Sequence, residues 1–594
     1  MKYSKIALLV SSMMMASGAY ASNTNTATVG QNGAGNSVTV TQQVNSSDNT
    51  AEVDQTGDSN VATVSQADTS NTLADIDQTG SSNTASISQF SSTQTATATI
   101  STTGDNNDAS IVQRFNNGDN AQALVNQVGS DNDAIIDQNN GDGANSTINQ
   151  LGSGDMAEIS NVWSDYADAT INQSVGGGNN AFISQDSSDY ASATVNQDGT
   201  GNQGTITQST STFFQSNTDD TVATLSQTGD GNIGTIDQTG VSNDATTSQN
   251  GVGNDSAVNQ SGDDNMSMLT QMGDSNIATV AQSGGLNEAT ASQDGMGNQS
   301  SVTQSGDDNM SMLTQTGDTN VATVLQSGTL ASATLMQSGM GSMAFVDQSG
   351  ASNSADVEQS GSMQTATVTQ LDSENIADID QQNTGNSATV MQSGNSGAGF
   401  GNLATINQVG DGDTASVTQF GDSNEAVVQT SGDSFSNNIT VLQTGVSNYA
   451  GAASELGGSS SITITQTGNG NSVGNLPGAA NYYGASIGAG TYGSDNIITV
   501  DQVGNDNQAY ADSADVSSVV DIDQTGDLNT AVAESWAGTD NEILISQTGM
   551  SHNSDVFVSG AGNNMVSITQ TDASNNAAVN TLGSGNTVTI VQGM

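Results

Sequence analysis

The sequence lacks most of the residue types on which folded enzymes depend. Its 594 residues include no cysteine, one proline, one histidine and 4% aromatic residues. Without cysteine the chain has no disulfide, no thiol nucleophile and no thiolate metal ligand. With His552 as the only histidine, it cannot build a catalytic triad or a histidine-rich zinc site. We therefore expect no enzymatic activity, no cofactor and no specific metal site, and we expect His552 to lie in an exposed turn.

Basic residues are almost absent as well. The chain has 3 Lys and Arg against 61 Asp and Glu, which gives a formal net charge of −58. Nucleic acids and anionic membrane surfaces are bound through basic patches, so neither is expected as a partner. Beyond the N-terminus no segment is long and apolar enough to span a bilayer. Such an acidic surface favours solubility and diffuse association with divalent cations.

The N-terminal residues have the pattern of a secretory signal. Lys2 and Lys5 precede an apolar stretch over residues 6–18, and Ala19 and Ala21 provide the small residues of a cleavage site. We therefore predict a signal peptide over residues 1–21 and a secreted mature protein.

A short motif fills most of the remaining chain. Residues 60–66 read N-x-A-x-V-x-Q, and the marker asparagine recurs about every eleven residues. Alternate side chains of a strand point to opposite faces, so Asn60, Ala62, Val64 and Gln66 share one face. Glycine-containing links between the motifs are typical of tight turns. This pattern predicts an all-β chain, folded as a parallel β-solenoid of stacked strand-turn-strand rungs of about 22 residues, amyloid-like and cross-β.

Stacking also explains how a chain with only 33% hydrophobic residues can order. Each buried amide can donate to the equivalent amide one rung away and accept from the rung on its other side. The expected structural ladder is formed by Asn60, Ala62, Val64 and Gln66, and again by Asn320, Ala322, Val324 and Gln326.

The repeat pattern is interrupted once at length. We expect one repeat array over residues 22–472, an atypical Gly- and Tyr-rich insertion over 473–496, and a second array over 497–594. The insertion is interpreted as a surface loop or a partial break of the solenoid. An aromatic contact site for a partner or a glycan is the alternative.

Charge in the turns follows a pattern of its own. Between residues 229 and 340 acidic and neutral turns alternate along both edges of the expected solenoid. Alternation places successive turn carboxylates about 9.6 Å apart, near the Debye length of roughly 8 Å at physiological salt. We infer that the acidic turns keep the chain soluble without blocking stacking, and assign this turn charge control to Asp230, Asp263, Asp274, Asp307 and Asp318.

Two twelve-residue segments match one consensus in full. Residues 55–66 and 315–326 both fit Q-x-G-x-x-N-x-A-x-x-x-Q, with near-copies along most of residues 22–594. This pattern resembles the curlin repeat of curli, the functional amyloid of Gram-negative bacteria. The resemblance implies a structural subunit of extracellular curli-like fibres at the cell surface, which support adhesion and the biofilm matrix. It also implies self-association, an outer-membrane secretion pore and a nucleating subunit as partners.

Both ends of the array read as ordinary strand units. An exposed, regular strand edge is a template for another chain, so we expect polymerisation through uncapped strand ends. The alternative is a soluble monomeric β-solenoid, acting as an adhesin or as an ice- or calcium-binding rod.

Overall fold

The computed structural model describes residues 24–43, 45–91, 93–115, 120–210, 220–394, 400–476 and 487–593. In these residues all regular structure is β-strand, as predicted. The chain divides into two compact units, residues 1–297 and 298–594. No helix among the described residues has the length and apolar character needed to cross a bilayer. The expected signal peptide, residues 1–21, lies outside the described residues.

Unit 1 contains two parallel sheets, here called the first sheet and the second sheet, to which successive strands belong in turn. In the first sheet the stacking order is β1 (Thr26–Asn32), β3 (Thr50–Thr56), β5 (Leu73–Ser81), β7 (Thr97–Asp105), β9 (Gln122–Ser130), β11 (Asn145–Gln150), β13 (Asp168–Gly177), β15 (Ser192–Thr200), β17 (Val222–Asp230), β19 (Asp244–Val252), β21 (Met266–Met272) and β23 (Glu288–Asp294). In the second sheet it is β2 (Ser37–Gln42), β4 (Val61–Ala67), β6 (Thr84–Phe90), β8 (Asp108–Arg114), β10 (Asp133–Asn139), β12 (Met156–Val162), β14 (Asn180–Asp186), β16 (Gln203–Ser209), β18 (Ile233–Thr239), β20 (Asp255–Asp263) and β22 (Ile277–Gly285).

Unit 2 repeats this arrangement. Its first sheet comprises β25 (Met310–Asp318), β27 (Ser332–Met340), β29 (Ser354–Ser362), β31 (Ile376–Thr384), β33 (Leu403–Gln408), β35 (Glu425–Thr430), β38 (Tyr449–Ser454), β41 (Ser472–Val473), β42 (Ala489–Thr491), β44 (Gln508–Val516), β46 (Thr530–Thr539), β48 (Asn553–Gly562) and β50 (Asn576–Ser584). Its second sheet comprises β24 (Gln299–Asp307), β26 (Val321–Thr329), β28 (Met343–Ala351), β30 (Thr365–Gln370), β32 (Ser387–Ser393), β34 (Thr414–Phe420), β37 (Asn438–Val446), β40 (Ser461–Asn469), β43 (Ile497–Val503), β45 (Val519–Asp527), β47 (Glu542–Met550), β49 (Met565–Ala573) and β51 (Thr587–Gln592). The short strands β36 (Ser434–Phe435) and β39 (Gly457–Gly458) pair separately beside them.

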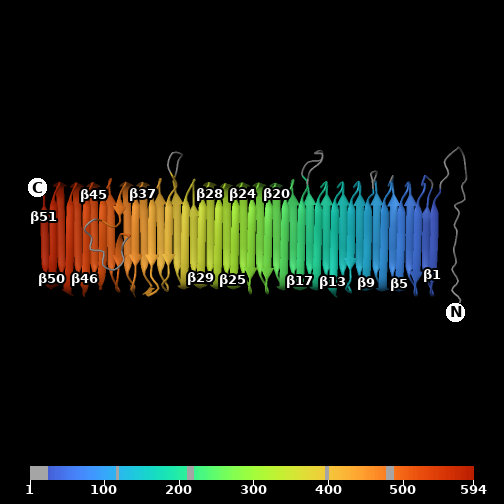
Figure 1. Cartoon of the computed structure of the whole chain (residues 1–594), viewed down its shortest axis with the longest axis horizontal. Coiled ribbons are helices and arrows are strands. Elements are labelled where there is room, and N and C mark those ends of the chain that lie inside the picture. The colour runs from blue at the N-terminus through green and yellow to red at the C-terminus, as the bar shows by residue number, and fades with distance from the viewer. Residues whose placement is uncertain are drawn as a thin grey trace. The chain divides into compact units, whose positions relative to one another are not determined.

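Each unit is a parallel β-solenoid. Within a unit the strands lie side by side in chain order, as the gradual change of colour along the stack shows (Figure 1). Equivalent residues of stacked rungs are typically 22 to 24 positions apart, as between Gln238 and Gln260. The offset rises to 30 between Gln197 and Gln227, and this gap includes residues 211–219. Extra residues are therefore accommodated in the links between strands, and the strands themselves stay in register.

The inner face of each rung is small and closely packed. Strand β4 alternates between inward residues, which are buried, and outward residues, which are exposed or half-buried. Ala62 and Val64 are 1% and 0% exposed, and Ala322 and Val324 of β26 have the same values. The β-branched residues favour extended backbone, and alternation directs one apolar row of each strand toward the opposite sheet. The apolar core of each unit thus consists mainly of the inward Ala, Val and Ile side chains of its two facing sheets.

Beside the 473–496 insertion the stack of rungs continues through the described residues. Strand β41 pairs with the first half of β38, and β42 pairs with its second half. Both short strands then pair with β44. Together they complete one rung of the first sheet between β38 and β44. Pro477, Tyr482 and Tyr483 lie outside the described residues.

The packing near this insertion departs from the usual rung. The outward side of the first sheet is buried there, where Tyr510 and Val532 contact Leu476. The inward residues of β44 and β46 are small, and the second sheet compensates with larger side chains, such as Ile498 and Ile543, where most rungs have alanine. Local volume is therefore conserved although the motif is lost.

A turn glycine provides a test of how tightly the rungs approach. Gly229 of β17 has φ +105°, and a Cβ added there would lie 2.1 Å from the carbonyl oxygen of Gly251 on the next rung. Gly231, two residues on, has φ +65° and no atom within 4 Å of the equivalent Cβ position. We expect Gly231→Ala to cost roughly 1–2 kcal/mol from its left-handed backbone alone. Gly229→Ala should cost clearly more, because the rungs must separate.

Amide hydrogen exchange in β17 and β19 measures both costs as free energies of local opening. Equal protection in the two variants would contradict the close approach of the two rungs at Gly229.

Candidate functional site: polar ladders, acidic turns and carboxylate clusters

Inward glutamines form hydrogen-bonded ladders parallel to the stack. In unit 1 the Gln42 Nε2 donates to the Gln66 Oε1 at 2.8 Å, and the Gln66 Nε2 donates to the Gln89 Oε1 at 2.9 Å. In unit 2, Gln326 accepts from Gln304 and donates to Gln348, both at 2.9 Å. Gln66 and Gln326 are 0% and 1% exposed. Gln66 and Gln326 are thus each satisfied by the glutamines on the rungs before and after them.

The same glutamines also join the two sheets. The Gln66 Nε2 lies 3.2 Å from the Thr50 carbonyl oxygen of β3, and the Gln326 Nε2 lies 3.0 Å from the Met310 carbonyl oxygen of β25. One N–H of the amide therefore follows the stack while the other crosses to the opposite sheet. Two donors and one acceptor of a neutral side chain are used without water.

Inward asparagines are directed at the turns. The Asn60 Nδ2 donates to the carbonyl oxygen of Gly80 at 2.9 Å, and its Oδ1 accepts the backbone N–H of Asn83 at 3.0 Å. Asn320 makes the equivalent bonds to Gly339 and Ser342, at 3.1 and 3.0 Å. The asparagine side chain thus secures the turn of the following rung and orients the strand that leaves it.

Other residues occupy some asparagine positions. His552 is 1% exposed, which corrects the expectation of an exposed turn. Its Nδ1 accepts the N–H of Asn575 at 3.3 Å and its Nε2 lies 3.1 Å from the carbonyl oxygen of Thr548, so the neutral Nε2–H form fits both contacts. Asp155 occupies the same position in unit 1, where burial raises the pKa of its carboxyl.

Turn carboxylates bond to the backbone of the preceding rung. Asp230 Oδ1 accepts from the N–H and hydroxyl of Thr200, at 3.0 and 2.5 Å, and these bonds hold the pKa of Asp230 below its usual value. Asp263 and Asp274 accept the backbone N–H groups of Val241 and Val252, at 3.1 and 3.0 Å. In unit 2, Asp307 and Asp318 lie at equivalent turns, Asp307 exposed and Asp318 half-buried. At Asp230, Asp263 and Asp274 an acidic turn thus bonds to a neighbouring turn that is neutral.

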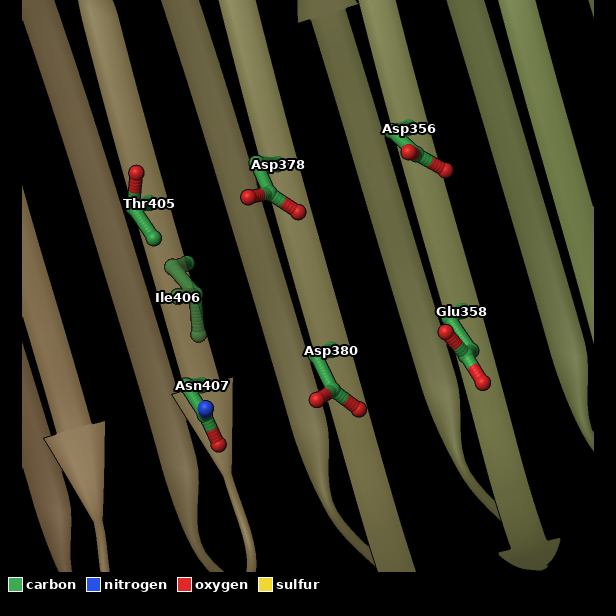
Figure 2. Close-up of a pocket in the computed structure, with 7 residues that line it drawn as sticks. All are labelled: Asp356, Glu358, Asp378, Asp380, Thr405, Ile406 and Asn407. Carbon is green, nitrogen blue, oxygen red and sulfur yellow. The ribbon is translucent and has the colours of Figure 1, made fainter.

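Four carboxylates also gather on an outward strand surface of unit 2. Asp356 and Glu358 of β29 lie in register with Asp378 and Asp380 of β31, beside a shallow hollow of about 210 Å³ (Figure 2). Burial raises the pKa of Asp378, and the neighbouring charges of Asp356 and Asp380 raise it further. The sequence interpretation missed this cluster, although the A-D-x-[D/E] pattern in successive first-sheet strands was the signal.

Similar carboxylate pairs occur elsewhere. In unit 1, Glu52 and Asp54 of β3 face Asp75 and Asp77 of β5, and burial followed by repulsion from Asp77 raises the pKa of Asp75 to about 6. Within the described ranges no group of three or more His, Asp or Glu is arranged to hold a metal ion.

A more deeply buried pair lies near the insertion. Asp512 and Glu534 of neighbouring strands are 2% and 3% exposed, and burial followed by Glu534 raises the pKa of Asp512 to about 7.

Comparison with known families gives one result. The model of the curlin associated repeat matches residues 47–80, 240–273, 273–306, 306–339, 339–371, 398–421 and 517–549. The matched segments contain the inward residues of β4 and β26 described above. No curated protein sequence matches the chain.

Removing one glutamine tests the ladder. Gln66→Ala leaves the amide N–H of Gln42 and the Oε1 of Gln89 without their rung partner, so we expect a loss of roughly 2–4 kcal/mol in the local opening free energy. Ser65→Ala, on the outward side of β4, is the control and should change it by less than about 0.5 kcal/mol. Amide hydrogen exchange in β4 and β6 measures both, and similar losses would exclude a specific role for the amide.

The strand carboxylates predict a pH dependence. The folded pKa of Asp75 is raised to about 6, so folding favours the protonated carboxyl. The resulting stabilisation is complete below the ordinary pKa of 3.8 and is lost as the pH rises through 6. Asp75→Asn should therefore increase the stability of this region at pH 7 and leave it nearly unchanged at pH 3.5. Exchange rates in β3 and β5 at both pH values measure the effect. A variant that is destabilised at pH 7 would contradict the inferred repulsion.

Proposed function

Because this chain belongs to the curlin-repeat family, we propose that it is the structural subunit of an extracellular curli-like fibre. Curlin-repeat proteins are structural rather than enzymatic, and they are associated with the cell surface. In this proposal the chain is secreted, polymerises outside the cell, and supports adhesion and the biofilm matrix.

The observation that carries the proposal is the uniformity of the contact between rungs. Within each unit, nearly every rung offers the next a parallel strand edge, a row of Gln or Asn amides and a row of Ala and Val side chains. A rung from a second copy would meet the same groups at the same spacing. The hydrogen bonds and apolar contacts that join rungs within one chain can therefore also join the end rungs of two chains.

The turn carboxylates enter the proposal as a control on assembly. Asp230, Asp263 and Asp274 in unit 1, with Asp307 and Asp318 in unit 2, leave intervening turns neutral. Their charges slow the approach of another acidic chain while the backbone bonds hold each turn in place. Diffuse divalent cations would screen the same charges.

Partners follow from the family membership. Export of such a subunit requires an outer-membrane secretion pore, and controlled growth requires a nucleating subunit. Both are part of the proposal, together with self-association as the main contact.

Fibre growth of residues 22–594 is the decisive test. We expect thioflavin-positive, detergent-resistant fibres with cross-β reflections near 4.8 and 10 Å, growing faster at high salt because turn charges are screened. Electron microscopy, X-ray fibre diffraction and growth curves measure these properties. A chain that stays monomeric for days at neutral pH would overturn the proposal and leave a soluble β-solenoid adhesin, or an ice- or calcium-binding rod.

A further inference from the structure

One long surface of unit 2 carries no charge on its strands. The outward side chains of β30, β32, β34, β37 and β40, here called the hydroxyl face, include no Asp, Glu, Lys or Arg. Most are Thr or Ser, and the middle row is Thr367, Thr389, Ser416, Thr440 and Thr463. In a chain with 61 acidic residues, an uncharged surface of this length stands apart.

The opposite side of the same rungs differs in charge. The first sheet carries the carboxylate cluster of Asp356, Glu358, Asp378 and Asp380 on β29 and β31. Asp347 of β28 and Asp501 of β43 border the hydroxyl face at its two ends. The strand charges of these rungs thus lie on the first sheet.

We propose that the hydroxyl face is the site at which a second copy of this chain packs laterally, face to face with the same surface. This contact runs sideways, across the rungs, whereas the proposed fibre grows by stacking rungs. It goes beyond the proposed function and does not require that fibres form.

Charge selects the partner. A copy of this chain has a formal charge of −58, so two copies approach best where neither presents carboxylates. A basic partner would instead be drawn to the carboxylate cluster. The turn acids Asp372 and Asp422 lie at the rim, where salt screens them.

Periodicity also favours a second copy. Strands of the hydroxyl face lie about 4.8 Å apart, and only a surface with the same repeat can interdigitate along its whole length. Two such faces would pack about 10 Å apart, with Thr methyl groups between the rows of the partner, as in paired sheets of cross-β assemblies.

The available area is that of a weak contact. The five strands of the hydroxyl face, at about 4.8 Å and each about 17 Å wide, give roughly 410 Å² per copy and about 820 Å² in total. Specific stable interfaces begin near 1,000 Å², so pairing through this face alone is expected to be reversible. Beyond β28, β26 adds the uncharged outward side chains of Val321 and Leu325 at one end.

Charged substitutions on the face test the proposal with residues 22–594, freshly purified and free of fibres. We expect the parent chain to self-associate at neutral pH, and the variant Thr389→Glu/Thr440→Glu to associate at least about tenfold more weakly. The matched neutral variant Thr389→Gln/Thr440→Gln should behave as the parent. At pH 3.5 the glutamates are protonated, so association of the Glu variant should recover.

A second pair of substitutions controls for added charge. Thr334→Glu/Thr405→Glu places the same two charges on the first sheet and should leave association unchanged. Sedimentation velocity measures association, and circular dichroism verifies that every variant remains folded. Fibre width by electron microscopy provides a second readout wherever fibres grow.

Several results would overturn the proposal. These are a parent chain that remains monomeric and forms fibres of the same width as the Glu variant, and equal weakening by the first-sheet control. Binding of a neutral polysaccharide to this face, without self-association, would also overturn it and assign the face to a glycan. Lateral pairing without fibres would support it while rejecting the proposed function.

Discussion

At most rungs of the described residues, a buried glutamine bonds to another glutamine one rung away. Gln66 lies between Gln42 and Gln89 in this way, and Gln326 lies between Gln304 and Gln348. An unsatisfied buried amide costs about as much as a hydrogen bond contributes, so a rung that slips by one residue loses both partners and exposes its Ala and Val rows. Strict register is the consequence. It explains why the links between strands vary in length while the strands stay aligned. It also explains why glycine lies where successive turns meet, as at Gly229 and Gly251.

Where the motif changes, neighbouring groups change with it. Ser513 and Ser535 occupy glutamine positions in β44 and β46, and the larger Ile498 and Ile543 of the second sheet fill the space that small residues leave. At the asparagine position of one rung, His552 accepts the backbone N–H of Asn575 as an asparagine would, and its Nε2 contacts the carbonyl oxygen of Thr548, four residues before it on the same rung. At these rungs the structure conserves volume, whereas the hydrogen bond of the glutamine is lost at Ser513, whose buried hydroxyl has no partner among the described residues.

The difference between patterns within a strand and contacts between rungs decides what the sequence could predict. The inward residues follow a period of two within a strand, which is visible locally, so the solenoid and the burial of Asn60, Ala62, Val64 and Gln66 follow from the motif alone. Contacts between rungs depend on offsets that range from 22 to 37 residues. The clusters at Asp75 and Asp378, and the buried pair of Asp512 and Glu534, therefore required the register. His552 was misplaced although residues 547–552 read Q-T-G-M-S-H, which puts the histidine at the asparagine position of the Q-x-G-x-x-N consensus.

Strict register also forces like charges together, and the chain treats two classes of carboxylate differently. A turn carboxylate such as Asp230 accepts hydrogen bonds from the neighbouring rung, which lower its pKa and favour its charged form. A strand carboxylate such as Asp75 or Asp378 instead faces acids on the next strand in a partly buried site, which raises its pKa. Charge at the Asp230 turn therefore contributes to stacking, while charge on Asp75 and Asp378 opposes it. The outward rows of β30, β32, β34, β37 and β40 carry no such charge, and this stretch is long enough to meet another copy.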